Sequence, residues 1–324
     1  MSQAKIRLQR GVFLDAASLD AGDIDFSCLR NEISQLEIRS HTAALDIADV
    51  LVHADVVMLN KVQFDKTILA QHPQLKLICL SATGSNNIDV SAAHAHNIAV
   101  ANVRAYATPS VVQHVFASLL ALTTRLFEIR AAIQSGEWSR SPHFSLLQYP
   151  IAELAGKKIG IIGYGELGQA VARVAECFGM QVLVAQRDAG DRRSQRLPLA
   201  ELLPQVDVLS IHCPLTDETR NRIAAAELKL MKPTALLINT ARGGIVNEAD
   251  LLQALKNKTI AGAALDVLSV EPPPADHILL QYQADNLIIT PHVAWASRES
   301  RQRCLQEMAL NIAAFKRGEL RNRL

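Results

Sequence analysis

A short stretch near the middle of the chain, residues 158–168, constrains the fold more than any other. It reads Lys-Ile-Gly-Ile-Ile-Gly-Tyr-Gly-Glu-Leu-Gly, and a helical pattern follows at once. An apolar run of strand type therefore ends in a tight glycine turn that opens a helix. Gly163 is expected to make the turn, Gly165 to let the backbone approach a pyrophosphate, and Gly168 to let helix and strand pack closely. Because the first N–H groups of a helix are unpaired and its dipole is positive there, the stretch predicts a dinucleotide-binding site.

Short apolar strands alternate with amphipathic helices on both sides of this stretch. Strands are expected at 12–14, 36–39, 56–59, 75–80 and 98–101 before it, and at 181–185, 208–212, 235–240, 262–267 and 286–290 after it. Alternation of this kind favours parallel sheets with helices on both faces. The chain is therefore predicted to be an α/β protein with two doubly wound parallel-sheet domains, the first of flavodoxin-like size.

Helices are expected between these strands and at the end of the chain. Shorter ones are predicted at 28–35, 42–52, 65–71, 91–96, 198–203, 224–229 and 248–257. Two longer ones are predicted at 110–134 and at about 297–317. Chain order alone does not say which domain the last helix joins.

Composition and charge exclude several classes of partner. The 324 residues contain 33 Lys and Arg against 32 Asp and Glu, so nothing in the net charge of +1 favours nucleic acid or a membrane surface. No run approaches the roughly 20 apolar residues that span a bilayer. The five cysteines are scattered and never form C-x-x-C, which disfavours disulfides and a metal site and fits a reducing cytoplasm.

Polar side chains follow three of the strands expected in the second half. Arg242 comes just after one strand, Glu271 after the next and His292 after the last. In an open parallel sheet, ligands bind outside the carboxyl ends of the strands. These three residues are therefore expected to share the edge that holds the cofactor.

Several motifs, in this order, resemble those of D-isomer-specific 2-hydroxyacid dehydrogenases over essentially the whole chain. They are the glycine turn 163–168, His212-Cys213-Pro214-Leu215-Thr216, Asn239-Thr240-Ala241-Arg242-Gly243, Glu271-Pro272 and Pro291-His292. Within the family, residues 81–89 and 292–297 most resemble bacterial glycerate dehydrogenases, which are hydroxypyruvate reductases.

The resemblance implies a domain division. Residues 1–103 and 292–324 would form a discontinuous, flavodoxin-like substrate-binding domain. Residues 104–291 would form an inserted Rossmann domain that binds the dinucleotide. The stretch 110–134 is apolar on more than one face, and in this family the corresponding region packs across a two-fold axis. A homodimer is therefore expected, with burial inside one subunit as the alternative.

The resemblance also implies roles for single residues. His292 would act as general acid towards the carbonyl oxygen of a 2-keto acid, with Glu271 favouring its imidazolium. Arg242 would pair with the substrate carboxylate or polarise the carbonyl. Cofactor contacts are expected from Gly163, Gly165, Glu166, Leu167, Gly168, Gln186, Arg187, His212, Cys213, Pro214, Thr240, Ala241 and Asp266.

The substrate itself is expected to meet a loop of the first domain. The backbone N–H groups of Thr83 and Gly84 match the family's carboxylate-binding loop, in which Ala82 stands where a glycine is usual. Trp295 is either a wall of the substrate pocket or a packing residue. No catalytic role is expected for the remaining histidines, which are His41, His53, His72, His94, His96, His114, His143 and His277.

The end of the strand 181–185 bears on the choice of cofactor. NAD enzymes usually carry an acid there to bind the ribose hydroxyls. Gln186 occupies that place and Arg187 follows, with Arg192 and Arg193 nearby. Arginine binds a 2′-phosphate well, so NADP is favoured. NAD remains an alternative because of Asp188: if the end of the strand lay one or two residues later, an acid would stand at the ribose-binding position.

The predicted function is NAD(P)H-dependent reduction of a small 2-keto acid to the D-2-hydroxy acid. Hydroxypyruvate, giving D-glycerate, is the first candidate substrate, together with glyoxylate, giving glycolate. The alternatives are reduction of pyruvate to D-lactate or of another 2-keto acid, and a dinucleotide-sensing scaffold without turnover.

Overall fold

The chain forms two compact units, each built on a parallel sheet. A computed structural model describes residues 6–188, 190–191, 193 and 195–324. Residues Met1–Ala107 and Trp295–Leu324 belong to the first unit, and Thr108–Ala294 form the second. The predicted α/β class with two doubly wound parallel sheets is confirmed. Contacts divide the chain after Ala107 and Ala294 rather than at the expected 103/104 and 291/292, because Thr108 opens a helix that packs on the second sheet.

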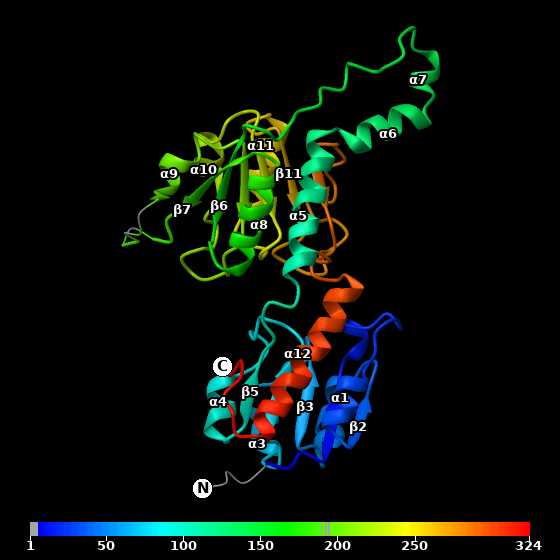
Figure 1. The fold of residues 1–324 in the computed structure, drawn as a ribbon, viewed down its shortest axis with the longest axis vertical. Coiled ribbons are helices and arrows are strands. Elements are labelled where there is room, and N and C mark those ends of the chain that lie inside the picture. The colour runs from blue at the N-terminus through cyan, green and yellow to red at the C-terminus, as the bar shows by residue number, and fades with distance from the viewer. Residues whose placement is uncertain (1–5, 189, 192, 194) are drawn as a thin grey trace. The chain divides into compact units, whose positions relative to one another are not determined.

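The first unit has a five-stranded sheet in the order β2-β1-β3-β4-β5 (Figure 1). This is the flavodoxin-like order, in which the chain starts inside the sheet and winds outwards in both directions. Its strands are β1 (Arg10–Phe13), β2 (Gln35–Ile38), β3 (Val56–Leu59), β4 (Leu77–Leu80) and β5 (Ala99–Ala101). Its helices are α1 (Ser27–Glu32), α2 (Ile47–Leu51), α3 (Lys66–Gln71), α4 (Val90–Ala95) and α12 (Arg298–Lys316).

Alternating side chains of these strands build two separate cores, one on each face of the sheet. Phe13, Met58 and Cys79 point to one face, where they pack with α1 and α12. Their neighbours in the chain point to the other face, where they pack with α2, α3 and α4. Because successive side chains of a strand face opposite ways, strands buried on both faces are apolar throughout, as β3 and β4 are. The last helix, α12, thus belongs to the first unit.

The second unit has a seven-stranded parallel sheet in the order β12-β11-β10-β9-β6-β7-β8. Its strands are β6 (Lys158–Ile162), β7 (Gln181–Ala185), β8 (Arg196–Leu197), β9 (Val208–Ile211), β10 (Leu236–Asn239), β11 (Gly262–Leu265) and β12 (Leu287–Ile289). The strand order reverses beside β6, the strand that leads into the glycine turn. In open α/β sheets this switch point is where ligands bind.

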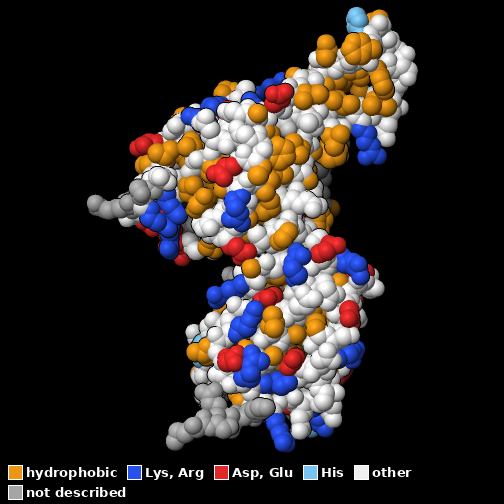
Figure 2. Space-filling model, in the orientation of Figure 1, with side chains coloured by type: hydrophobic (Ala, Val, Ile, Leu, Met, Phe, Trp, Pro, Cys, Tyr) orange, Lys and Arg blue, Asp and Glu red, His pale blue; other side chains and the backbone are white. Residues whose placement is uncertain are grey.

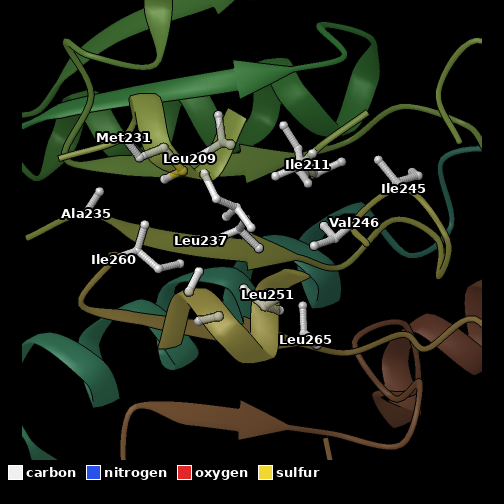
Figure 3. Close-up of a cluster of buried hydrophobic side chains, with 14 of the residues drawn as sticks. Leu209, Ile211, Met231, Ala235, Leu237, Ile245, Val246, Leu251, Ile260 and Leu265 are labelled. Atoms are coloured by element: carbon white, nitrogen blue, oxygen red, sulfur yellow. The ribbon is translucent and has the colours of Figure 1, made fainter. Parts of the chain in front are cut away.

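Helices cover this sheet, and one arm leaves it. The helices are α5 (Thr108–Thr123), α6 (Leu126–Gln134), α7 (Glu137–Arg140), α8 (Glu166–Cys177), α9 (Leu199–Leu202), α10 (Ala225–Leu230) and α11 (Glu248–Lys256). Leu209, Leu237 and Leu251 lie in the core between sheet and helices (Figure 3). The elements α6 and α7, with the loop after them, extend away from the sheet of this unit (Figure 1).

The structure differs from the sequence prediction at several elements. The single helix expected at 110–134 is two helices, α5 and α6, with a bend of 56°. Hydroxyls of Thr123 and Thr124 donate back to carbonyls of α5, and Arg125 has a left-handed φ of 53°, which ends that helix. The helix expected at 28–35 stops at Glu32, because Gln35 opens β2. The strand β8 was not predicted, because its two residues are too few to show the alternation of apolar and polar side chains that indicates a strand.

The only apolar helical segment of membrane-spanning length in the described chain is this bent pair. No single described helix is long and apolar enough to cross a bilayer; α5 and α6 reach that length and composition only together. Most apolar side chains of α5 are buried inside the second unit, for example those of Val115 and Leu119. The composition of α5 is therefore that of a core helix.

Candidate active site

Three glycines shape the turn between β6 and α8, and the space around the Cα atom differs from one to the next. Gly163 has a φ of 89°, and a Cβ there would lie 2.5 Å from the backbone of His212. A Cβ on Gly168 would lie 2.1 Å from the Gly163 carbonyl oxygen, so helix and turn approach as only glycine allows. At Gly165 a Cβ would meet nothing within 4 Å, so that this backbone faces open space. The turn thus has one tight side, against β9, and one open side for a ligand.

The first turn of α8 and the end of β9 border this turn. Glu166 and Leu167 start the helix, and the Glu166 carboxylate accepts a hydrogen bond from the Thr108 hydroxyl. Because α8 begins directly after Gly165, its first N–H groups have no carbonyl to pair with inside the helix, and this geometry suits a pyrophosphate.

Unpartnered buried atoms lie on the same sheet edge. His212 Nε2 is 2.8 Å from Ser210 Oγ, while its Nδ1 is buried without a hydrogen-bond partner in the described chain. Burial lowers the pKa of His212 to about 4, so the ring is neutral near pH 7. The Thr240 hydroxyl is also buried without a partner among the described residues. Buried polar atoms left unpaired cost free energy, so a ligand with polar groups fits this edge.

Cys213 and Pro214 continue the segment after β9. Burial raises the pKa of the Cys213 thiol, and the nearby Arg222 guanidinium partly opposes that rise. The thiol is therefore neutral near pH 7 and contributes an apolar surface to this edge.

The end of β7 is rich in arginine. The Arg187 side chain is 83% exposed, with its Nε 3.8 Å from Asp188. Arg222, which the sequence prediction did not single out, donates to the carbonyl oxygens of Gln186 at 2.9 Å and Arg187 at 2.8 Å. Asp191 is already engaged, because Arg193 and Arg196 both bind its buried carboxylate. Arg192 lies outside the described residues.

The turn after β10 carries Arg242 and is closed by Asn239. The Asn239 side chain accepts from Ala241 N–H and donates to the Arg242 carbonyl, both at 3.0 Å. A Cβ on Gly243 would lie 1.9 Å from the Leu268 carbonyl oxygen. The turn with Arg242 is therefore packed directly against the loop after β11, the loop that leads to Glu271.

That loop is braced at several points. Glu271 Oε1 accepts from Leu268 N–H at 2.9 Å, which folds the loop back on itself. Glu248, at the start of α11, accepts from the Ser269 N–H and hydroxyl and lies 3.1 Å from His277 Nε2. Glu271 is thus presented by a loop tied to the helix behind it.

His292 and Glu271 form a direct pair. Nδ1 of His292 lies 2.7 Å from Glu271 Oε2, and both side chains are about one-third exposed. A carboxylate at this distance orients the ring through its Nδ1. His292 has a left-handed φ of 55°, and its N–H donates to the Asp266 carbonyl at 2.8 Å. The backbone conformation is therefore held by the neighbouring strand end.

The Asp266 carboxylate fixes the whole segment around His292. It is 2% exposed and accepts from the Thr290 hydroxyl at 2.5 Å, Val293 N–H at 2.9 Å and Ala294 N–H at 2.8 Å. His114 of α5 lies 3.0 Å from the same Thr290 hydroxyl. The sequence analysis expected no catalytic role for His114 and did not single out Thr290 as a site residue; the structure places both beside the Asp266 side chain.

The expected site residues fall into both units. The ends of β10, β11 and β12 bring Arg242, Glu271 and His292 to one edge of the second sheet. Ala82, Thr83 and Gly84 belong to the first unit, after β4. Trp295 also belongs to the first unit; it packs against that unit's core and meets Tyr106 edge to face at 6.5 Å. Among the described residues, no three His, Cys, Asp or Glu side chains gather as metal ligands.

A strand-end acid–base pair beside a glycine-rich turn in an open parallel sheet defines a dinucleotide-dependent oxidoreductase. Residues 116–294 match the family model of the D-isomer specific 2-hydroxyacid dehydrogenase NAD-binding domain. The chain belongs to this family. It is therefore an enzyme that reduces 2-keto acids to D-2-hydroxy acids with a nicotinamide dinucleotide.

Relatives share most of the chain. A glycerate dehydrogenase of Methylorubrum extorquens is 43% identical over 96% of this chain and 97% of its own length. A hydroxypyruvate reductase of Blautia hydrogenotrophica is 35% identical over 95% of this chain and 97% of its own length. A solved acyclic imino acid reductase in complex with NADPH and D-Arg is 26% identical, with a TM-score of 0.84 over 98% of this chain and all of that one.

The glycine turn generates a prediction with an internal control. Gly168→Ala should lower the melting temperature and weaken NADPH binding at least about tenfold, because its Cβ cannot fit beside the Gly163 carbonyl. Gly165→Ala should keep the melting temperature and weaken binding alone, because its Cβ meets only open space. Thermal unfolding and a fluorescence titration with NADPH measure both. Normal binding by Gly165→Ala would show that no pyrophosphate lies against this backbone.

Proposed function

We propose that this enzyme reduces hydroxypyruvate to D-glycerate, and glyoxylate to glycolate. The observation that carries the chemistry is the 2.7 Å contact between His292 and Glu271 on the cofactor edge. The choice of substrate is supported by the glycerate dehydrogenase and the hydroxypyruvate reductase that the chain resembles over nearly its whole length. Pyruvate, giving D-lactate, is the second candidate.

The residues at the carboxyl ends of the strands of the second unit would divide the chemistry among them. The reduced nicotinamide, when bound, supplies a hydride to the carbonyl carbon of the keto acid. His292 donates a proton to the carbonyl oxygen as negative charge develops there, and Glu271 stabilises the imidazolium that does so. Arg242 binds the substrate carboxylate or polarises the carbonyl through its planar set of donors. As the family resemblance implies, the N–H groups of Thr83 and Gly84 would bind the substrate carboxylate, and Trp295 would either border the substrate or only pack.

A substrate panel tests the proposed reaction. Hydroxypyruvate, glyoxylate and pyruvate are each assayed with NADPH and NADH, and chiral analysis identifies the product. Hydroxypyruvate is expected to give the highest kcat/KM, with D-glycerate as product. A clear preference for pyruvate would favour the D-lactate alternative. Cofactor binding without turnover of any 2-keto acid would favour a dinucleotide-sensing scaffold.

His292 gives the sharpest test of the mechanism. His292→Gln should lower kcat by roughly 10²–10⁴, the usual contribution of a positioned general acid, and leave cofactor binding nearly unchanged. His94→Gln, an exposed histidine of α4, serves as the control. Steady-state kinetics and a cofactor titration of both variants check this. Retention of more than about half of the wild-type kcat by His292→Gln would remove it from the mechanism.

NADP is the proposed cofactor, because the end of β7 carries arginine rather than an acidic residue. Gln186 stands where an acid would bind an NAD ribose, and Arg187 is exposed beside it. Asp191 does not compete for Arg187's guanidinium, because Arg193 and Arg196 bind its carboxylate. The competing assignment has Asp188 bind the ribose of NAD. Asp188 Oδ1 accepts from Gly190 N–H at 2.9 Å, which turns that carboxylate towards its own loop.

Arg187→Ala separates the two cofactors. If the guanidinium binds the 2′-phosphate, KM for NADPH should rise about tenfold, since a charge-assisted hydrogen bond contributes about 1.5–3 kcal/mol. KM for NADH should barely change. Lys256→Ala, which removes an exposed charge from α11, is the control. Equal losses for both cofactors, or a wild type that prefers NADH, would contradict NADP.

The apolar arm of the second unit supports a homodimer. The expected apolar surface of 110–134 is divided: α5 is largely buried in its own unit, whereas Leu126, Phe127 and Ile133 of α6 are about half exposed. The arm continues this surface with Phe144 at 92% and Leu147 at 87% exposure. Figure 2 shows hydrophobic side chains gathered over this arm.

The same chain also carries an apolar groove. This groove of about 470 Å³ lies between α5 and α8 and is lined by side chains such as Val112, Phe116 and Val174. We propose that the arm of one copy docks in the groove of a second copy, since large exposed apolar patches mark sites of association and closed dimers are the commonest oligomers.

Light scattering tests this dimer. The wild type should have the mass of a dimer at micromolar protein, and Leu147→Asp should shift it towards the monomer, because a charge would be buried at the interface. Leu45→Asp, at a 93% exposed site of the first unit, should remain dimeric. A wild-type monomer would exclude the proposal.

The cytoplasm is the proposed location. All five cysteines have free thiols, two of them buried and none paired in the described chain. Unpaired thiols are typical of proteins in a reducing compartment.

A further inference from the structure

The loop after β4, residues 82–84, is held by the segment that follows β5. Val103 N–H donates to the Ala82 carbonyl at 3.2 Å, and Asn102 Nδ2 donates to the Thr83 carbonyl at 2.7 Å. In return, the Thr83 hydroxyl donates to the Val103 carbonyl at 2.9 Å. Three hydrogen bonds thus join the loop to two consecutive residues.

These bonds set the direction of two backbone N–H groups. In a trans peptide the N–H lies opposite the carbonyl of the same planar unit. The Ala82 carbonyl shares its peptide with Thr83 N–H, and the Thr83 carbonyl shares its peptide with Gly84 N–H. Because both carbonyls face residues 102–103, both N–H groups face away from them. Neither donates a hydrogen bond within the described chain, and successive unpaired N–H groups form an anion-binding concavity.

Asn102 is itself fixed from the side of the last helix. Asn102 is only 4% exposed. Its backbone N–H donates to the Asn322 carbonyl at 3.1 Å, and its backbone carbonyl accepts from Asn311 Nδ2 at 2.7 Å. Asn311 lies in α12 and is bound in turn by Arg321 and by the Asn322 side chain. The segment 321–324 runs beside β5, where Leu324 N–H donates to the Val100 carbonyl at 3.0 Å (Figure 1).

We propose that Asn102 is a positioning residue for the substrate carboxylate. By holding the Thr83 carbonyl, its amide aims the Gly84 N–H, and with it the anion-binding face of the loop, at the carboxylate of a small 2-keto acid. α12 and the segment 321–324 keep Asn102 in place. This inference rests on the proposed function, in which residues 82–84 bind that carboxylate.

Two substitutions separate positioning from catalysis. Asn102→Ala removes the amide, and Asn102→Asp keeps its shape but replaces the donor by an acceptor that repels the Thr83 carbonyl. KM for the 2-keto acid should rise about tenfold or more in both, because the Gly84 N–H would no longer be aimed at the substrate carboxylate and its hydrogen bond to that charged group would be lost. The kcat should stay within about threefold, because Arg242, Glu271 and His292 lie on the second unit.

A matched control excludes general destabilisation. Asn60 is a buried asparagine of the same unit, 6% exposed, whose amide donates to the Ser18 hydroxyl instead of the loop. Asn60→Ala should lower the melting temperature as Asn102→Ala does, and leave KM near the wild-type value. Equal increases in KM for the two alanine variants would overturn the proposal.

A measurement without turnover separates this inference from the proposed function. Oxalate, a dicarboxylate that resembles the keto acid, is titrated into the ¹⁵N-labelled full chain, and the amide signals of Thr83 and Gly84 are followed. They should shift in the wild type, and Asn102→Ala should need about tenfold more oxalate for the same shift. Identical titrations would overturn the role of Asn102, whatever the enzyme reduces. An inactive wild type with the expected oxalate shifts would contradict the proposed function alone.

Discussion

The hydrogen bonds to the buried Asp266 side chain hold the segment that carries His292 at the edge of the second sheet. A carboxylate taken out of water is costly unless donors surround it, and here the Thr290 hydroxyl and two backbone N–H groups do so. If the segment after β12 left this position, the buried Asp266 side chain would lose these hydrogen bonds. The left-handed backbone of His292 is held in the same way, by the Asp266 carbonyl. Strain of this kind persists only where its surroundings over-determine it.

Close contacts between turns link this edge to the expected cofactor site. The glycine turn after β6 packs on the backbone after β9 at Gly163, and the turn after β10 packs on the loop after β11 at Gly243. Side chains would hold these turns apart, so the two glycines allow consecutive strand ends to form one continuous surface. The glycine turn and the loops that carry Glu271 and His292 therefore lie at the same edge of this sheet, each packed against the end of a neighbouring strand.

Much of the fold and of the candidate site follows from local sequence, and the rest depends on long-range contacts. Each strand of the two sheets that spans three residues or more lies in or near an apolar run, because strands buried on both faces must be apolar. The motifs around Arg242, Glu271 and His292 point to one edge because parallel strands align their carboxyl ends. The break at Arg125 was not predictable, since the periodicity continues through it. Asn102 and Arg222 were not singled out either, because their hydrogen-bond partners lie far away in the chain.

The sequence by itself determined the α/β class, the glycine turn between strand and helix, and the family. Those properties rest on periodicity and on motifs whose residues are neighbours in the chain. The tertiary structure decided which partner each polar group has: Thr290 for Asp266, Thr83 for Asn102, and Arg193 with Arg196 for Asp191. A buried polar group accepts whichever donor the packing brings within reach, and that proximity exists only after the strands and helices have assembled.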